Sequence, residues 1–209
     1  MNNNKLVVVD TNCLVRIYFS SLRPLLGQPA SGYVLNTLAE LAAELRGLAK
    51  SDELAWLSDP GIQKDVAAGL VELSRKQKET IRDDARGIRD FSDGVLRKHC
   101  EANKTVRIRA LSLADAKALA ATLELQAALA TDEWALRHIA DLYDGDDGNP
   151  VELFSSVELL RLLEKEGLLS REERIQTYRG WLRDGANLLK GSNQRYFELF
   201  DEAPPTAQS

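Results

Sequence analysis

Residues 5 to 14 read KLVVVDTNCL, an apolar run that stops at Asp10, Thr11 and Asn12. Successive apolar and β-branched residues are typical of a strand that is buried on both faces of a parallel sheet. The residues that follow such a strand lie at the carboxyl edge of the sheet, where open α/β proteins bind their ligands. We therefore expect a buried strand at 5–9 that delivers a carboxylate, a hydroxyl and an amide to a binding edge.

The rest of the chain predicts an α/β fold, because further strand-like runs alternate with helical patterns. Buried strands are expected at 127–130 and in VELFSS, at 151–156. Helices are expected from about 14 onwards and at 33–49, 112–121, 132–143, 157–168 and 170–190. Strands joined by helices through right-handed crossovers give a parallel sheet with helices on both faces, which is an α/β/α sandwich.

One domain over 1–200 is the expected organisation, since 209 residues suffice for a single substantial core. Helical periodicity and charge pairs four residues apart predict a helical insertion over about 50–105. The stretch VRIRAL at 106–111 reads either as a short strand or as the lead-in to the next helix, and 151–190 holds the closing strand and helices. The polar residues 201–209 predict a disordered tail.

The composition is that of an ordinary soluble protein, with 44% apolar and 28% charged residues. The longest apolar runs are too short to cross a membrane, and the polar start MNNNK lacks a signal-peptide core, so we expect a cytoplasmic protein without membrane contact. Cys13 and Cys100 are the only cysteines, so the sequence suggests neither a disulfide framework nor a cysteine zinc site. His99 and His138 likewise lack the partner ligands of a zinc site.

The charge of the chain is uneven. Its net charge of −5 argues against a protein that wraps nucleic acid over its whole surface. Between Arg75 and Arg109, however, eleven basic residues stand against six acidic ones. This positive middle can contact RNA phosphates, or simply face solvent as charge-rich helices usually do. Trp134 and Trp181 are expected in the core or at an interface rather than as platforms for bases.

Four acidic residues from distant stretches are expected to converge at the carboxyl edge of the sheet. Asp10 ends the first strand, and Asp132 follows the strand at 127–130. Asp115 lies in the first turn of a predicted helix, and Glu40 lies on the polar face of another. Their convergence would place several carboxylates where ligands bind.

Each of these acids also has a structural interpretation. Ser112 and Asp115 have the spacing of a capping box. Thr131 can cap the helix that follows it, and Glu40 can be a solvated residue, as most glutamates are. Asp10 is the least easily explained in this way, because the mouth of a buried strand commonly binds ligands. The acidic loop DGDDGNP is interpreted as a solvated turn, since it lies between a helix and the next strand.

Four stretches occur in an order known from one protein family: VVVDTNCLV, LAEL, LSLADAKALA and ALATDEWALRHIA. In this order they resemble the PIN-domain ribonucleases, among them the VapC-like toxin nucleases. The resemblance covers the first 20 residues and 106–143, continues through 151–186, and is weak over 46–105, which is longer than in compact members. It implies a PIN-like parallel sheet flanked by helices on both faces.

The resemblance also implies a metal site. In the family four acids hold one or two magnesium or manganese ions, and by motif they fall on Asp10, Glu40, Asp115 and Asp132. Glu44 is an alternative to Glu40 for the helix acid, because it lies one helical turn away. Glu133 is an alternative to Asp132 for the last acid, because members of the family differ in which residue after the threonine is acidic. Asn12 and Thr131 match small polar residues that border the site, and carboxylates without histidine or cysteine suit hard cations such as Mg²⁺ or Mn²⁺.

The activity that the resemblance implies is metal-dependent hydrolysis of RNA phosphodiester bonds, leaving a 3′-hydroxyl and a 5′-phosphate. Bacterial members of modest size are often toxins that form homodimers and are silenced by a small antitoxin, so we expect these partners. Two alternatives stay open. A phosphatase of the haloacid dehalogenase type also starts with an apolar strand that ends in aspartate, but it needs a second aspartate where this chain has Asn12. A catalytically silent PIN-like scaffold that binds RNA normally lacks an acid, and none is obviously missing here.

Overall fold

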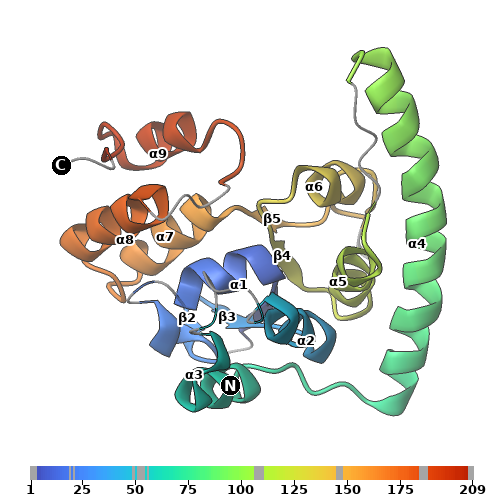
Figure 1. Cartoon of the computed structure of the whole chain (residues 1–209), viewed down its shortest axis with the longest axis horizontal. Helices are drawn as coiled ribbons and strands as arrows, with labels where there is room; N and C mark the ends of the chain where they lie inside the picture. The colour runs from blue at the N-terminus through green and yellow to red at the C-terminus, as the bar shows by residue number, and fades with distance from the viewer. Residues whose placement is uncertain are drawn as a thin grey trace.

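The computed structural model describes residues 4–18, 20, 22–48, 50, 55, 57–105, 111–144, 148–183 and 188–206. In this part of the chain five strands form one sheet in the order β2-β3-β1-β4-β5, accompanied by nine α-helices (Figure 1). The strands are β1 (Lys5–Val9), β2 (Pro29–Ala30), β3 (Tyr33–Asn36), β4 (Ala128–Ala130) and β5 (Leu153–Phe154). The helices are α1 (Thr11–Tyr18), α2 (Ala39–Leu48), α3 (Pro60–Ala68), α4 (Arg75–Ala102), α5 (Leu113–Glu124), α6 (Trp134–Ala140), α7 (Ser156–Lys165), α8 (Arg171–Arg183) and α9 (Ser192–Phe200).

The sheet is mostly parallel. β1 lies at its centre and pairs in parallel with β3 and β4, β5 continues in parallel beside β4, and only β2 runs antiparallel at the edge. The expected α/β class and the strand at 5–9 are thereby confirmed, and the strand is buried at Val7, Val8 and Val9. Among the described residues, none of the helices combines the length and the apolar character that crossing a membrane requires.

Alternation along β1 divides the core between the two faces of the sheet. Val7 and Val9 belong to one apolar cluster and Val8 to another, and all three are fully buried. The first cluster includes residues of α1, α7 and α8, and the second includes residues of α4, α5 and α6. Helices therefore cover both faces, which is consistent with an α/β/α sandwich.

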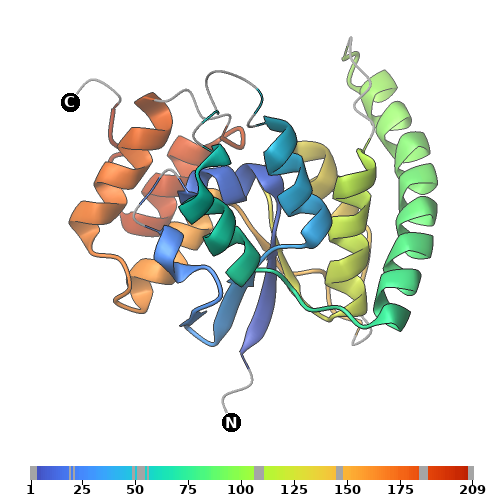
Figure 2. The same ribbon diagram turned by 60° about the horizontal axis from the view of Figure 1, so that its bottom comes forward.

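The predicted helical insertion contains α3 and α4. Asp59 caps α3, because its carboxylate accepts the N–H of Gly61 at 2.8 Å. α4 begins with a capping box in which Ser74 and Gln77 satisfy each other's backbone N–H groups. α4 packs along α5 and forms the outermost layer on its side of the molecule (Figure 2). Residues 106–110, expected as a short strand or lead-in, lie outside the described part of the chain.

The prediction of one helix over 33–49 is wrong in its first part. β3 occupies the start of this range, and the helix begins only at Ala39. A tight turn at Gly32, which has a φ of 79°, reverses the chain from β2 into β3. The hydroxyl of Thr37 then donates to the carbonyl of Val9 at 2.9 Å, so the end of β3 is held beside the end of β1. Leucine spacing alone did not reveal this hairpin.

Other elements differ from the predicted ones at their ends. The helix after β1 starts at Thr11 rather than near residue 14, and β5 retains two residues of the predicted strand at 151–156. α6 is shorter than the predicted 132–143. β2 and α9 were not predicted, because the one lies in a stretch rich in helix breakers and the other follows the last strongly periodic segment.

The C-terminal residues pack on α8. Arg171 donates to the carboxylate of Glu202 through two nitrogens, at 2.8 and 2.9 Å. Arg174, which is 1% exposed, also contacts Glu202 at 3.2 Å and stacks over the ring of Phe200 at 3.9 Å. The contacts with Glu202 fall at the start of the range expected as a tail, and residues 207–209 lie outside the described part.

Candidate functional site

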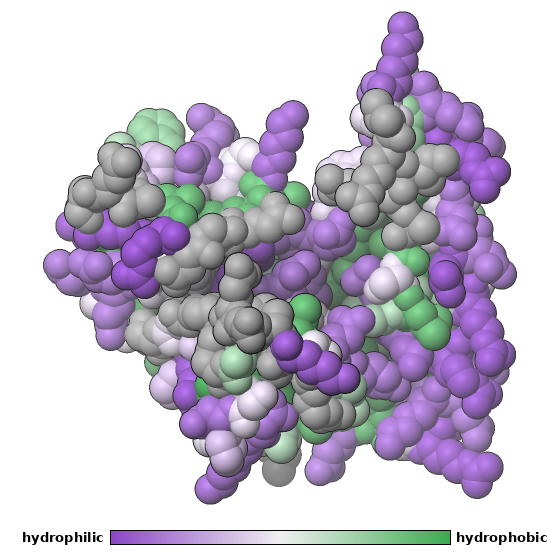
Figure 3. Space-filling view, viewed as in Figure 1, coloured by the Kyte–Doolittle hydropathy of each residue, from purple (hydrophilic) through white to green (hydrophobic). Residues whose placement is uncertain are grey.

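A pocket of about 480 Å³ opens at the carboxyl edge of the sheet, around which Figure 1 shows α1, α2, α5 and α6. Four carboxylates contribute to its walls: Asp10, Glu44, Asp115 and Glu133. They come from the end of β1, from α2, from the first turn of α5 and from the residue before α6. In the space-filling view the surface between α6 and the α7–α9 helices is notched and mainly hydrophilic (Figure 3).

Asp10 is held at the end of β1 by neutral groups. It is 2% exposed, its carboxylate accepts the N–H of Cys13 at 2.7 Å, and the hydroxyl of Thr131 donates to its second oxygen. Burial raises the pKa of Asp10 from 3.8 to about 6, against the lowering effect of these two hydrogen bonds. The nearby charges of Asp132 and Asp115 raise the pKa further. A cation in the pocket would relieve this repulsion.

Asp115 has both of the roles that the sequence allowed. Its carboxylate accepts the N–H of Ser112 at 3.2 Å, and its own N–H donates to the Ser112 hydroxyl at 3.0 Å, which completes a capping box. The same side chain lines the pocket. Burial raises its pKa, although hydrogen bonds from the side chain and the backbone of Ser112 to the carboxylate lower it. Capping therefore fixes the position of an acid that still faces the pocket.

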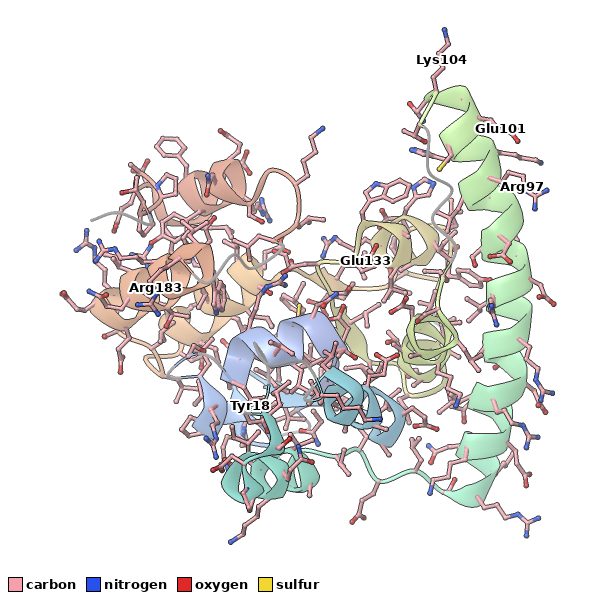
Figure 4. The ribbon with its side chains drawn as sticks, viewed as in Figure 1. Tyr18, Arg97, Glu101, Lys104, Glu133 and Arg183 are labelled. Atoms are coloured by element: carbon pink, nitrogen blue, oxygen red, sulfur yellow. The ribbon has the colours of Figure 1, made fainter. Side chains whose placement is uncertain are left out.

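Asp132 lies at the end of β4 but is turned away into a buried ion pair. It is 6% exposed, and Arg16, 5% exposed, donates to one of its oxygens. Ser156 donates to both oxygens, with its N–H at 3.0 Å and its hydroxyl at 2.6 Å. The walls of the pocket do not include Asp132 but include its neighbour Glu133, which Figure 4 shows at the start of α6.

The two glutamates of α2 also differ in position. The Glu40 side chain is 46% exposed and pairs with Lys117 at 3.5 Å, outside the pocket walls. The Glu44 carboxylate lines the pocket and accepts the hydroxyl of Thr11 at 2.6 Å. Glu44 and Glu133, the two alternative positions, thus accompany Asp10 and Asp115, whereas Glu40 and Asp132 do not.

The two small polar residues expected to border the site lie beside it. Asn12 is exposed in the first turn of α1 and lines the pocket. Thr131 is fully buried, and its hydroxyl donates to Asp10 while it accepts the N–H of Glu133 at 3.0 Å. Thr131 therefore links the backbone position of Glu133 to the orientation of Asp10.

Arg16 and Ser156 are site residues that sequence reasoning missed. The guanidinium of Arg16 contacts the hydroxyl of Ser156 at 3.1 Å as well as Asp132. Its backbone carbonyl accepts the indole N–H of Trp181 at 3.1 Å, which ties it to α8. The available signal was an arginine on the apolar face of the helix that follows Asp10, but no partner for it can be read from the sequence.

The donor set suits a hard divalent cation, because the pocket offers carboxylates with hydroxyl and amide oxygens but no histidine or cysteine. In the described residues no three acidic, histidine or cysteine side chains are gathered closely enough to hold a metal ion as they stand. Asp10, Glu44, Asp115 and Glu133 are the residues that would hold one after side-chain rotation. Burial, followed by the charges of Asp132 and Asp115, raises the pKa of Asp10, and shifts of this kind cluster at functional sites.

Comparison of the chain with protein-family models, with curated proteins and with solved structures found no match. Any assignment of function must therefore come from the chemistry of the pocket together with the sequence motifs.

Proposed function

We propose that the chain is a metal-dependent endoribonuclease that hydrolyses RNA phosphodiester bonds at the acidic pocket with Mg²⁺ or Mn²⁺. The observation that carries the proposal is the meeting of four carboxylates from distant parts of the sequence on one pocket at the carboxyl edge of a parallel sheet. Like charges brought together in this way repel one another, and a bound cation offsets that repulsion. RNA as the polymer, and a 3′-hydroxyl with a 5′-phosphate as the products, follow from the resemblance to PIN-domain ribonucleases.

The protein's own groups would position the reaction. Asp10 is oriented by the Cys13 N–H and the Thr131 hydroxyl, and Asp115 by its capping box with Ser112. Held in this way, Asp10 and Asp115 need less reordering when substrate arrives. When bound, a divalent cation supplies positive charge that stabilises the anionic transition state and acidifies the attacking water.

The biological setting proposed with this activity is that of a cytoplasmic toxin. It would act as a homodimer and be silenced by a small antitoxin, as in the bacterial proteins that the motifs resemble. Gene order tests this part alone: a short adjacent gene for a DNA-binding antitoxin supports it, and the absence of any such neighbour would remove the toxin role without affecting the nuclease.

One observation favours a catalytically silent PIN-like scaffold as the second candidate. Asp132 matches one of the family's acids by motif, but here Arg16 neutralises it inside the protein. A scaffold would bind RNA without cleaving it. The choice between the two depends on whether Glu133, in the neighbouring position, replaces Asp132 as the acid of the pocket.

Cleavage of a pool of structured RNAs in Mg²⁺, Mn²⁺ or EDTA tests the nuclease. We expect cleavage that needs the metal and falls about 100-fold or more in Asp10→Asn, since preorganised charge at a reacting centre contributes on that scale. Glu40→Gln is the matched control, because Glu40 lies outside the pocket, and it should cleave like the wild type. RNA that stays intact with both metals, although the protein binds it, would favour the scaffold.

A further inference from the structure

Three rings gather beside the acidic pocket, and we call them the ring cluster: His99, Trp134 and His138. Trp134 and His138 lie one turn apart on α6 with nearly parallel rings, at an interplanar angle of 7° and a centroid distance of 5.5 Å. His99, near the end of α4, places its ring 5.0 Å from that of Trp134 and 4.7 Å from that of His138. Trp134 directly follows Glu133, which lines the pocket.

The ring cluster is partly open to solvent. All three side chains are of intermediate exposure. Trp181 offers the contrast, because it is 2% exposed and its indole N–H donates to the carbonyl of Arg16. Trp181 therefore has the core position expected for both tryptophans, whereas Trp134 packs against the second apolar cluster and keeps part of its surface exposed.

Exposed basic side chains lie at the end of α4 that carries His99 of the ring cluster. Arg97, Lys98 and Lys104 are exposed there with one acid, Glu101, between them, and Figure 4 shows Lys104 at the free end of the helix beyond Arg97 and Glu101. Within the described residues none of these three cations forms an ion pair. Solvated, unpaired cations of this kind attract the phosphates of a nucleic acid.

We propose that the ring cluster is a stacking platform for unpaired bases of a single-stranded RNA whose backbone continues into the acidic pocket. The proposal rests on the proposed function and adds to it a base-binding subsite made of this chain's own rings. The faces of aromatic rings stack on any base, so such a platform accepts many sequences. Bases inside a duplex already stack on one another and do not offer their faces, so paired RNA would be excluded.

The experiment measures binding in EDTA, so that it does not depend on cleavage. A fluorescently labelled single-stranded RNA of twelve mixed nucleotides and the same RNA in a duplex serve as probes, followed by anisotropy. Trp134→Leu keeps an apolar side chain but removes the aromatic face, and Trp134→Phe keeps a face. Phe91→Leu is the matched control, because Phe91 is an exposed ring of α4 that contacts Tyr143 edge-on rather than the ring cluster.

We expect Trp134→Leu to weaken binding of the single strand about tenfold, the scale of one lost base–aromatic stack. Trp134→Phe should keep most of the affinity, Phe91→Leu all of it, and the duplex should bind weakly to every variant. Equal single-strand affinity for wild type and Trp134→Leu would overturn the proposal, as would an equal loss in Phe91→Leu. If Trp134→Leu does not fold, as judged by circular dichroism, His138→Leu takes its place with the same expectations.

Failure of the platform and failure of the nuclease are distinguishable. Metal-dependent cleavage together with ring-independent binding would overturn the platform and leave the nuclease intact. Ring-dependent binding of single strands without cleavage in either metal would support the platform and remove the nuclease. If the rings only pack α4 against α6, Trp134→Leu lowers the thermal midpoint and leaves RNA affinity unchanged, which would also overturn the proposal.

Discussion

Asp10 and Asp132 leave adjacent parallel strands at the same edge of the sheet, yet their surroundings are opposite. Among the described residues Asp10 accepts hydrogen bonds from two neutral groups, the Cys13 N–H and the Thr131 hydroxyl, and its pKa is raised to about 6. Asp132 faces the guanidinium of Arg16 and is turned away from the pocket. A buried carboxylate whose donors are neutral can still be stabilised by binding a cation. A carboxylate that is already paired with arginine has a structural role instead.

The largest expected effect concerns the ion pair of Asp132 with Arg16. Arg16→Met leaves Asp132 as a buried charge without its cation, so we expect the free energy of unfolding to fall by about 3–5 kcal/mol. Chemical denaturation followed by circular dichroism measures it. The double variant Arg16→Met with Asp132→Asn removes both charges and should recover most of the loss. A single variant as stable as the wild type would show that the pair does not hold the fold.

Asp10→Asn should instead raise the free energy of unfolding, because it removes a charge that burial disfavours. The pKa of Asp10 is raised from 3.8 to about 6, so the folded chain binds this proton more tightly than the unfolded chain. This contribution to stability is complete below pH 3.8 and is lost as the pH rises to about 6. At pH 7 Asp10→Asn should therefore be more stable than the wild type, by up to about 3 kcal/mol.

Denaturation at pH 4 and pH 7 checks this prediction. The advantage of Asp10→Asn should be small at pH 4 and develop as the pH approaches 6. Asp132→Asn is the comparison variant, and it should destabilise at both pH values because it leaves Arg16 buried without its carboxylate. An Asp10→Asn variant that is less stable than the wild type at pH 7 would mean that Asp10 has a structural role like that of Asp132.

The smallest expected effect separates the two glutamates of α2. Glu44→Gln removes a carboxylate from the pocket and should weaken Mn²⁺ affinity and RNA cleavage about 10-fold, or 1.4 kcal/mol. Glu40→Gln removes an exposed charge whose pair with Lys117 lies outside the pocket, so it should change neither. Parallel titrations and cleavage assays of the two variants measure the difference. A greater loss in Glu40→Gln than in Glu44→Gln would reverse the assignment.

The sequence predicted the strand that precedes Asp10, because successive apolar and β-branched residues are typical of a buried strand in a parallel sheet. It failed at 33–36, where leucines at helical spacing belong partly to β3, and pairing with β1 outweighs a local pattern. It also left Glu40 and Glu44 open, since a helix places residues one turn apart on nearly the same face. The role of Arg16 could not be predicted from the sequence, because its partners Asp132 and Ser156 follow more than 110 residues later in the chain.

The most direct test of the central claim is calorimetric titration of Mn²⁺ into the wild type, Asp10→Asn and Asp132→Asn at pH 7.5. If the pocket around Asp10 is a cation site, the wild type binds Mn²⁺, Asp10→Asn loses the binding, and Asp132→Asn, compared under conditions where it stays folded, retains it. Binding that survives in Asp10→Asn and disappears in folded Asp132→Asn would contradict the account. So would a wild type that binds no Mn²⁺ at all.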